Sequence, residues 1–480
     1  MTQTDTMSVT VLTGATIITM DPQRRVLADA AIAFGETILA VGPSVDVVAA
    51  YPFATVRDCR GAAIMPGMVN THTHLFQTLL KGLGDDRVLS DWMTTMTGPS
   101  AAELTPEDAN AAALHGCAEA LTTGTTTILD FCYAHPRAGI GDAVAEGMRD
   151  VGIRGIVARG YLTSGDDVGL PKEIVEPLST ALDDASRLMS EWNTPNARVT
   201  VGLAPCMSWS VDEATLIETR ALADQHNALI TMHLAETPFD VSESVRRFGM
   251  RDVPFAAKTG LLGPDLVGVH CVQVDDADIG LIADTDTKVS HNPCSNLYLA
   301  SGFAPVPVMQ RRGITVGLAT DGPASSSNHS MLQAVKIAAL LHKGVHRDPE
   351  IITAEKVLEM ATIDGARCVG MEDRIGSLEV GKKADLIVLD LDNLCVTPLH
   401  AAASSIVYSQ RGDEVRDVYV DGQQVVAAGR LTLVDESDIK AKSRNAAMSL
   451  AKRAGTDQLA HHEWRSLIER VNSSSGPGVG

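Results

Sequence analysis

Positive charge is scarce in this chain of 480 residues. Lys and Arg number 39 against 60 Asp and Glu, which gives a formal net charge of −21. Nucleic acids and anionic membranes are bound through clustered Lys and Arg, so this balance argues against both as partners. A small neutral or cationic molecule is the partner that we expect.

Paired cysteines, a basic leader and long apolar runs are also missing. The eight cysteines stand singly, and none belongs to a Cys-x-x-Cys pair, which favours a reduced compartment. The first basic residue is Arg24, so the N-terminus lacks the basic start of a signal peptide. No uncharged apolar run reaches the ~18 residues of a membrane span. We therefore expect a cytoplasmic protein.

The two ends of the chain carry similar patterns of short strands. Residues 8–60 and 382–430 consist of short apolar or alternating runs, broken by Gly and Pro, and the later stretch turns at Asp421-Gly422. With 45% hydrophobic residues the chain can bury a sizeable core. We expect the two ends to pair in one composite β-sandwich domain.

Between these ends, short β-branched runs alternate with helical stretches. There are eight such runs: IMPGMVNTH, TTTILDF, IRGIVARGY, RVTVGLAP, ALITMHLAE, LVGVHCV, TKVSHNP and ITVGLATDG. One helix is opened by Thr105-Pro106, where Thr can cap and Pro fits the first turn. Eight such units predict an α/β fold, a closed (β/α)₈ barrel of the TIM type.

These patterns divide the chain into four parts. We predict the N-terminal part of the composite β-domain over residues 1–64 and the barrel over 65–376. The C-terminal part of the β-domain follows over 377–436, and a charged helical tail over 437–480 ends in SSSGPGVG.

The first barrel strand ends in His72-Thr73-His74. Residues two apart share one face of a strand, so both imidazoles can point into the mouth of the barrel. Two histidines at this spacing also arise by chance, and the motif alone leaves a ligand pair and incidental histidines equally open.

Other residues of the metal-ligand type follow other predicted strands. His233, His270 and Asp321 lie at strand C-termini, where barrel active sites are built. Imidazoles with a carboxylate match the ligand preferences of zinc. Glu236, three residues after His233, could reach a water beside the metal and move a proton, whereas elsewhere in the chain it would be taken for a solvated loop residue.

Two alternative metal sites lack their residues. The fourth strand, RVTVGLAPCMSWS, contains no Lys that could form a bridging carbamate, so a single metal is expected. The zinc deaminase scaffold that uses His-x-Glu with Pro-Cys-x-x-Cys is excluded, because Pro293-Cys294 lacks the second cysteine.

Several motifs together resemble a known family. PGMVNTHTH, HLAE, His270-Cys271, SHNPCSN, ATDG and IGSLEVGKKADLIVLD resemble the amidohydrolase superfamily, in its cytosine deaminase-like and chlorohydrolase-like branch, over about residues 8–435. Within that branch, APVPVM and VHRDPEIITAEKVLEMATIDGAR look closest to the s-triazine hydrolases, which include atrazine chlorohydrolase and melamine deaminase.

The resemblance implies one Zn²⁺ per subunit, with Fe²⁺ as the minority alternative. It assigns the metal to His72, His74, His233 and Asp321. In this chemistry the metal activates a water that attacks the ring carbon bearing the leaving group. Glu236 would protonate the adjacent ring nitrogen, and His270 and Asp321 would orient the attacking oxygen and pass its proton on.

The same resemblance points to substrate contacts at Gln77, Trp92, Asn296 and Ser325. Three of them have a structural alternative. Trp92 could belong to the core packing, Asn296 could brace the loop after strand seven, and Ser325 could be an ordinary turn serine. His291 is expected near the site but not as a ligand.

The chain departs from the s-triazine hydrolases directly after Asp321. There atrazine chlorohydrolase carries Asn and melamine deaminase Asp, whereas this chain has Gly322. The choice between chloride and amine as leaving group is therefore open, and Asp-Gly, the commoner pattern among deaminases, favours the amine.

The function that we predict is metal-dependent deamination, with dechlorination as a further activity, of an s-triazine such as melamine. The alternative is a purine-type deaminase acting on guanine, 8-oxoguanine or S-adenosylhomocysteine, because only the pocket loops distinguish the two. A metal-free scaffold acting through oligomer contacts is opposed by the intact set of histidines and acids. The resemblance also implies a homo-oligomer, a dimer or larger.

Overall fold

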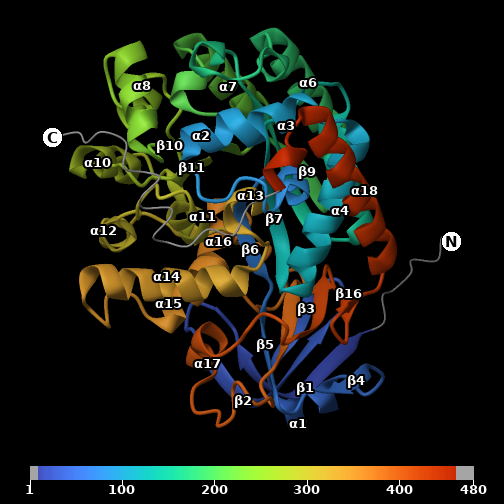
Figure 1. Cartoon of the computed structure of the whole chain (residues 1–480). Coiled ribbons are helices and arrows are strands. Elements are labelled where there is room, and N and C mark those ends of the chain that lie inside the picture. Colours follow the sequence, from blue (N-terminus) through green and yellow to red (C-terminus); the bar gives the residue numbers. More distant parts are fainter. Residues whose placement is uncertain (1–8, 461–480) are drawn as a thin grey trace, which may run out of the picture.

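The computed structural model describes residues 9–460 and consists of a barrel wrapped by helices and a sheet packed against one end of it (Figure 1). Two segments far apart in the sequence, in blue and orange-red, build the sheet together. Among residues 9–460, no helix combines the length and the apolar character that crossing a membrane requires.

The barrel has eight parallel strands in sequential order. They are β6 (Met68–Thr73), β7 (Thr125–Cys132), β8 (Arg154–Tyr161), β9 (Val199–Pro205), β10 (Ile230–Leu234), β11 (Leu266–His270), β12 (Lys288–His291) and β13 (Val316–Leu318). The ring closes nearly completely, because the Asp321 amide donates to the His72 carbonyl at 3.1 Å. The predicted (β/α)₈ fold is confirmed.

Helices follow the strands and surround the barrel. The longer ones are α4 (Pro106–Thr122), α5 (Ile140–Val151), α6 (Leu178–Trp192), α7 (Glu213–His226), α8 (Pro238–Phe248), α10 (Asp276–Asp284), α14 (Met331–His346) and α15 (Ala354–Ala361). Helix α4 begins where predicted: Thr105 Oγ1 accepts from the Asp108 amide at 3.2 Å, and Asp108 accepts from the Thr105 amide at 3.1 Å.

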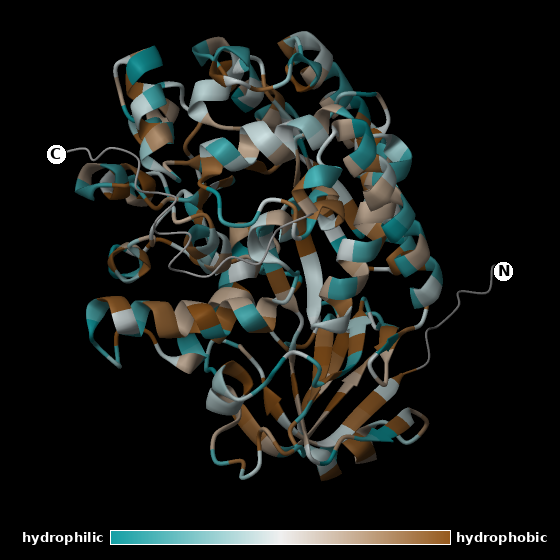
Figure 2. Ribbon diagram, viewed as in Figure 1, coloured by the Kyte–Doolittle hydropathy of each residue, from teal (hydrophilic) through white to brown (hydrophobic). Residues whose placement is uncertain are grey.

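The apolar strands form the core between these layers. Strands β7 and β8 are buried along their whole length, as expected for a barrel strand with side chains inside and helices outside. Figure 2 shows hydrophobic strands most clearly in the sheet at the bottom of the view, and helices that carry both hydrophilic and hydrophobic turns.

The composite sheet joins both ends of the chain in nine strands. They are β1 (Thr10–Ile18), β2 (Val26–Phe34), β3 (Ile38–Pro43), β4 (Thr55–Asp58), β5 (Ala62–Pro66), β14 (Leu386–Asp390), β15 (Val415–Val420), β16 (Gln423–Ala427) and β17 (Arg430–Leu431). The antiparallel pair β5 and β14 connects the N-terminal and C-terminal strands. A short helix, α1 (Ser44–Ala50), interrupts the N-terminal strands and was not predicted.

The segment after the sheet is helical, as expected for a charged tail. Helix α18 (Glu436–Ala454) packs along α4, where Arg453 contacts Asp108 and the Glu103 carbonyl, and Ser443 Oγ lies 2.7 Å from His115 Nδ1. Residues 461–480 of the predicted tail lie outside the described residues. The four domain limits stay predictions.

Candidate active site

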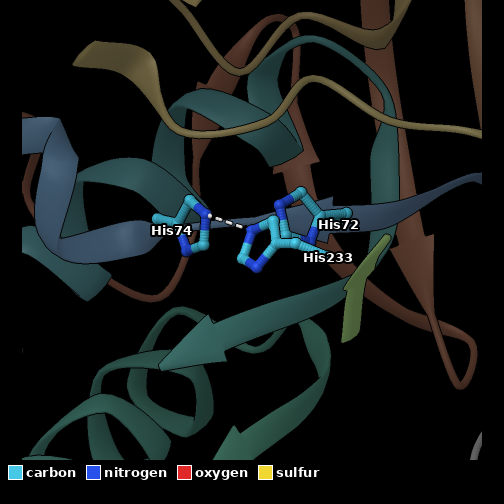
Figure 3. A group of neighbouring side chains, drawn as sticks. All are labelled: His72, His74 and His233. Carbon is cyan, nitrogen blue, oxygen red and sulfur yellow. Dashed lines mark hydrogen bonds between the residues drawn. The ribbon is translucent and has the colours of Figure 1, made fainter. Parts of the chain in front are cut away.

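Three histidines converge at the C-terminal ends of the barrel strands. His72 and His74 come from the end of β6 and His233 from β10, and Figure 3 shows their rings facing one another. One nitrogen of each lies within 4.8 Å of the others, and all three side chains are buried. The alternation of β6 brings both rings to the inner face of the barrel, as its sequence predicts.

Hydrogen bonds fix which nitrogen of each ring faces the centre. His74 Nδ1 donates to the Phe131 carbonyl and His233 Nδ1 to the Cys206 carbonyl, each at 2.8 Å. A carbonyl oxygen can only accept, so in the neutral rings both Nε2 atoms carry lone pairs. These two Nε2 atoms lie 3.3 Å apart (the dashed line in Figure 3), with no proton to share between neutral rings.

Such an arrangement of lone pairs suits a cation. Histidines that ligate metals usually donate their other N–H to a backbone carbonyl or carboxylate, as His74 and His233 do. Neither ring nitrogen of His72 has a hydrogen-bond partner among the described residues, although the ring is fully buried. Burial lowers the pKa of His74 to about 3, which keeps its ring neutral as a ligand must be. The residues therefore fit a bound metal ion.

Asp321 adds a carboxylate to this group. Its Oδ1 lies 3.3 Å from His72 Nε2 and 3.5 Å from His74 Nε2. Burial opposes its charge, but the neighbouring imidazoles of His72, His74 and His270 outweigh burial and hold the pKa of Asp321 well below its usual range. An ionised carboxylate next to three imidazoles is a ligand set typical of zinc.

Two of these residues adopt a strained backbone. His270 and Asp321 have φ values of 68° and 61°, in the left-handed region that costs a residue with a side chain about 1 kcal/mol or more. Two hydrogen bonds hold Asp321 in this conformation. Its backbone amide donates to the His72 carbonyl, and the Gly322 amide donates to Asp321 Oδ1 at 2.6 Å.

Glu236 lies beside the histidines in the sequence HLAE, just past β10. Its side chain is buried, and its Oε2 lies 3.4 Å from His270 Nε2, while Ser301 Oγ donates to Oε1 at 3.2 Å. Burial raises the pKa of Glu236 to about 7, because the stabilisation of its charge by His270 and Ser301 does not offset burial and the neighbouring charges of Asp240 and Asp321. A carboxyl with this pKa can both hold and release a proton near neutral pH.

His270 is oriented from behind by a residue that we expected in the pocket. Asn296 Oδ1 accepts from His270 Nδ1 at 2.8 Å, so that His270 Nε2 points to Glu236 and Asp321. Asn296 is fully buried and does not line the cavity. Asn296 belongs to α11 (Pro293–Tyr298), the short helix after β12, and its contact with a substrate stays a prediction.

The other three predicted substrate contacts do line a cavity over the site. Gln77 and Trp92 follow β6, and Ser325 follows β13. The indole N–H of Trp92 donates to the Ala324 carbonyl at 3.3 Å, and Ser325 Oγ lies 3.4 Å from Asp321 Oδ2. An apolar cavity with a few convergent polar groups is the usual form of a small-molecule site.

Several lining residues have no signal in the sequence. Tyr133, Leu162, Leu170 and Leu299 also face the cavity, from three different strand-to-helix connections. Tyr133 directly follows β7, so its position after a barrel strand could have been noticed. The three leucines have no pattern that distinguishes them from ordinary core residues.

His291 does not line the cavity. It is fully buried, and its Nε2 lies 3.3 Å from Nε2 of His342 on α14. We expected His291 near the site but not as a ligand, and in the structure it is paired with another buried histidine.

The fold and this cluster define a class: a barrel hydrolase with a histidine-rich metal site at the C-terminal ends of its strands. Residues 63–425 match the Amidohydrolase family, which is most of the chain. The chain belongs to this family, and it is an amidohydrolase that acts on carbon–nitrogen bonds other than peptide bonds. The predicted family and class of enzyme are thus confirmed.

Curated relatives are named as deaminases of adenine nucleosides. A 5-methylthioadenosine/S-adenosylhomocysteine deaminase of Nitratidesulfovibrio vulgaris is 37% identical over 433 residues, which covers 90% of this chain and 95% of the relative. A 5'-deoxyadenosine deaminase of Methanothermobacter thermautotrophicus is 36% identical over 397 residues, covering 82% and 89%.

Solved structures of both predicted kinds are similar to this one. An adenosine deaminase from Xanthomonas campestris with bound zinc has a TM-score of 0.86 and 31% identity, covering 92% of this chain and 98% of its own. Atrazine chlorohydrolase from Arthrobacter aurescens, complexed with zinc, has a TM-score of 0.85 and 28% identity, covering 91% and 100%. The relatives support hydrolytic deamination. They favour the alternative prediction, a purine-type substrate, over the predicted s-triazine substrate.

Proposed function

We propose that this chain is a zinc-dependent hydrolytic deaminase of adenine nucleosides that lack a 5'-hydroxyl group, the class to which its curated relatives belong. The observation that carries the proposal is the convergence of unpaired imidazole nitrogens beside the buried carboxyl of Glu236. The relatives' names then supply the kind of ring.

The metal would be held by His72, His74, His233 and Asp321. Zinc is favoured because the donor set is three imidazoles and one carboxylate, and because similar structures contain zinc. A bound zinc ion supplies Lewis acidity that makes a water a better nucleophile near neutral pH. Fe²⁺ stays the minority alternative.

The protein's own groups would handle the protons. A water oxygen adds to the ring carbon that bears the amine, the carbon–nitrogen bond breaks, and ammonia leaves. Glu236, which lines the cavity beside His270, would protonate the neighbouring ring nitrogen as the water adds and would regain a proton from the added oxygen as the carbonyl forms. His270, oriented by Asn296, and Asp321 would position the water and receive its proton, which finally reaches the leaving amine.

Substrate contacts are proposed at Gln77, Trp92 and Ser325. Gln77 Oε1 is buried without a hydrogen-bond partner among the described residues, so it can accept from an N–H or O–H of the substrate. The Trp92 ring offers an apolar face to an aromatic ring. Ser325 Oγ lies next to Asp321, so it can contact the end of the substrate ring that faces Asp321.

An s-triazine amine is the second candidate substrate. The observation that favours it is the similarity to atrazine chlorohydrolase over 91% of this chain. The cytoplasmic location and the homo-oligomer, with a small molecule as the partner, stay predictions.

The test is ammonium and chloride release by the zinc-loaded full chain. The substrates are 5'-deoxyadenosine, 5'-methylthioadenosine, guanine, melamine and an amino-chloro-s-triazine. We expect ammonium from the two nucleosides. Turnover of the triazines alone would overturn the nucleoside assignment and support the second candidate, and turnover of guanine alone would overturn both.

A further inference from the structure

The cavity above the site has one polar end and one apolar wall. At the polar end lie the groups already described, including His233, Glu236 and Asp321. The wall consists of Leu89, Trp92, Leu162, Leu170, Ile174 and Leu299, which are between 1% and 9% exposed. The reacting carbon must face the polar end, so the rest of a bound molecule must face the wall.

Three separate connections build this wall. Leu89 and Trp92 belong to α2 (Leu89–Trp92), after β6. Leu162 and Ile174 lie in the connection after β8, and Leu299 follows α11 (Pro293–Tyr298), after β12. Apolar side chains thus come from independent parts of the chain to one surface, which points to a ligand rather than to one helix packing its core face.

Among residues 9–460, no Lys or Arg lines the cavity. Two arginines on the same segments are paired with acids, and Lys172, between the wall residues Leu170 and Ile174, is exposed and does not line the cavity. Arg159, near the end of β8, binds Glu176 at 2.7 Å and Asp184 at 2.9 Å, and Arg87, before α2, binds Asp91 at 2.9 Å. A carboxylate or phosphate on the substrate would therefore face the apolar wall without a cation, at a high desolvation cost.

We infer that the part of the substrate farthest from the reacting amine is uncharged and apolar. The inference rests on the proposed function and deepens it. It separates two compounds that share the adenosine and thioether groups: 5'-methylthioadenosine, which ends in a methyl group, and S-adenosylhomocysteine, which ends in an amino acid. The first is a substrate of this chain, and the second is not.

Matched pairs test this inference with the zinc-loaded full chain. We expect kcat/KM for 5'-methylthioadenosine to exceed that for S-adenosylhomocysteine by about 100-fold or more, and 5'-deoxyadenosine to exceed adenosine 5'-monophosphate likewise. Equal values within either pair, or a preference for the charged member, would overturn the inference.

A variant isolates the effect of charge. Met93, a partly buried residue of the cavity lining, tolerates a long polar side chain better than the fully buried wall residues do. Met93→Arg should narrow the preference for 5'-deoxyadenosine over adenosine 5'-monophosphate by about tenfold or more, whereas Met93→Gln, of similar length and uncharged, should not. An unchanged ratio in a folded, zinc-containing Met93→Arg protein would count against the wall as the source of selectivity.

Failure of the proposed function gives a different result. If none of the four adenosine compounds releases ammonium, the nucleoside assignment fails, and the wall is then tested by binding. An N-alkyl melamine should raise the Tm of the zinc-loaded chain more than an N-carboxyalkyl melamine does. Equal shifts, or no shift with either compound, would overturn the inference itself.

Discussion

Gly322 determines where the carboxamide of Gln77 can lie. A Cβ added at Gly322 would lie 2.0 Å from Gln77 Oε1 and 3.1 Å from the His74 Cβ. The φ of Gly322 is −73°, which any residue can adopt, so space rather than backbone conformation requires glycine here. The position where this chain departs from the s-triazine hydrolases is thus the position that lets Gln77 turn towards the cavity.

Gly322→Ala should displace Gln77 and weaken substrate binding. We expect KM for the best substrate to rise about tenfold or more, since a buried hydrogen bond to the substrate is lost, with zinc content retained. Steady-state kinetics measure the effect. Gly344→Ala on α14, where an added Cβ meets no atom within 4 Å, is the control and should leave KM unchanged.

The double variant checks the cause. If Gly322→Ala acts through Gln77, then Gln77→Ala should raise KM in the original chain but add little in the Gly322→Ala chain. Additive effects of the two substitutions would show that Gly322 acts in another way.

Glu236 is the second residue whose replacement has a defined result. Glu236→Gln keeps the shape of the side chain but cannot donate a proton as a carboxyl group does, so kcat should fall by about 10³-fold. The zinc content and the Tm should stay close to those of the original chain, because Glu236 is not among the proposed ligands. Ser301→Ala, which removes one donor to Glu236, is a milder control. A Glu236→Gln protein with near-normal kcat would exclude Glu236 as the proton carrier.

At the scale of elements, a buried carboxyl group on β7 is hydrogen-bonded to the chain just after β6, next to a proposed metal ligand. Asp130 on β7 is 1% exposed, and its Oδ1 accepts from the Leu75 amide at 2.7 Å. Leu75 directly follows His74, so this bond fixes the chain where it leaves β6. Burial raises the pKa of Asp130 to about 7, despite the amide that stabilises its charge.

The raised pKa predicts how stability changes with pH. The unfolded carboxyl has the ordinary value of 3.8 and the folded one about 7, so between these values the folded state binds more protons. The stability contributed by the protonated Asp130 is complete below pH 3.8 and is lost as the pH rises through 7. Asp130→Asn cannot lose this proton, and its amide oxygen can still accept from Leu75.

Urea unfolding at pH 5 and pH 8 measures this loss. Between these values the free energy of unfolding of the original chain should fall, relative to Asp130→Asn, by on the order of 2 kcal/mol. Both proteins carry the same metal load, so titration of the other groups cancels in the comparison. Parallel changes in the two proteins would mean that Asp130 is ionised at both pH values.

At the scale of the whole molecule, a buried ion group joins the barrel to the composite sheet. Arg154 on β8 binds Asp385 at 2.8 Å with both side chains 1% exposed, and it also binds Asp421 at the turn between β15 and β16. The turn predicted at Asp421-Gly422 thus meets the barrel at the end opposite the active site.

Arg154→Met should destabilise the fold strongly. It leaves Asp385 buried without its cationic partner, which typically costs about 3–5 kcal/mol, whereas Asp421 keeps its ion pair with Arg198 at 3.0 Å. Urea unfolding measures the loss, and Arg60→Met, which breaks an exposed ion pair with Asp58, should have little effect. Equal effects of the two substitutions would mean that the barrel and sheet are held together by apolar contacts alone.

Removal of the metal also acts on the whole molecule. Chelation should abolish ammonium release and lower the Tm, because the lone pairs of His74 and His233 then face each other without a cation. Added zinc should restore both, with about one ion per chain by elemental analysis. Full activity in a protein free of metal would contradict a metal-dependent reaction.

The sequence by itself determined the order of strands and helices and the identity of the clustered groups. Periodicity and caps are local properties, so the eight barrel strands, the Thr105 cap and the pair of end segments could be read directly from it. His72, His74, His233 and Asp321 were found because they follow barrel strands, and the closed ring brings such ends together.

Only the tertiary structure decided what surrounds these groups. Gln77 and Gly322 are 245 residues apart in sequence, Asn296 lies behind His270 rather than in the cavity, and the apolar wall combines three separate connections. Loops carry no period, and their side chains face whatever the closed barrel brings opposite them. The candidate ligands could therefore be predicted from sequence, while the shape of the cavity depends on contacts between distant segments.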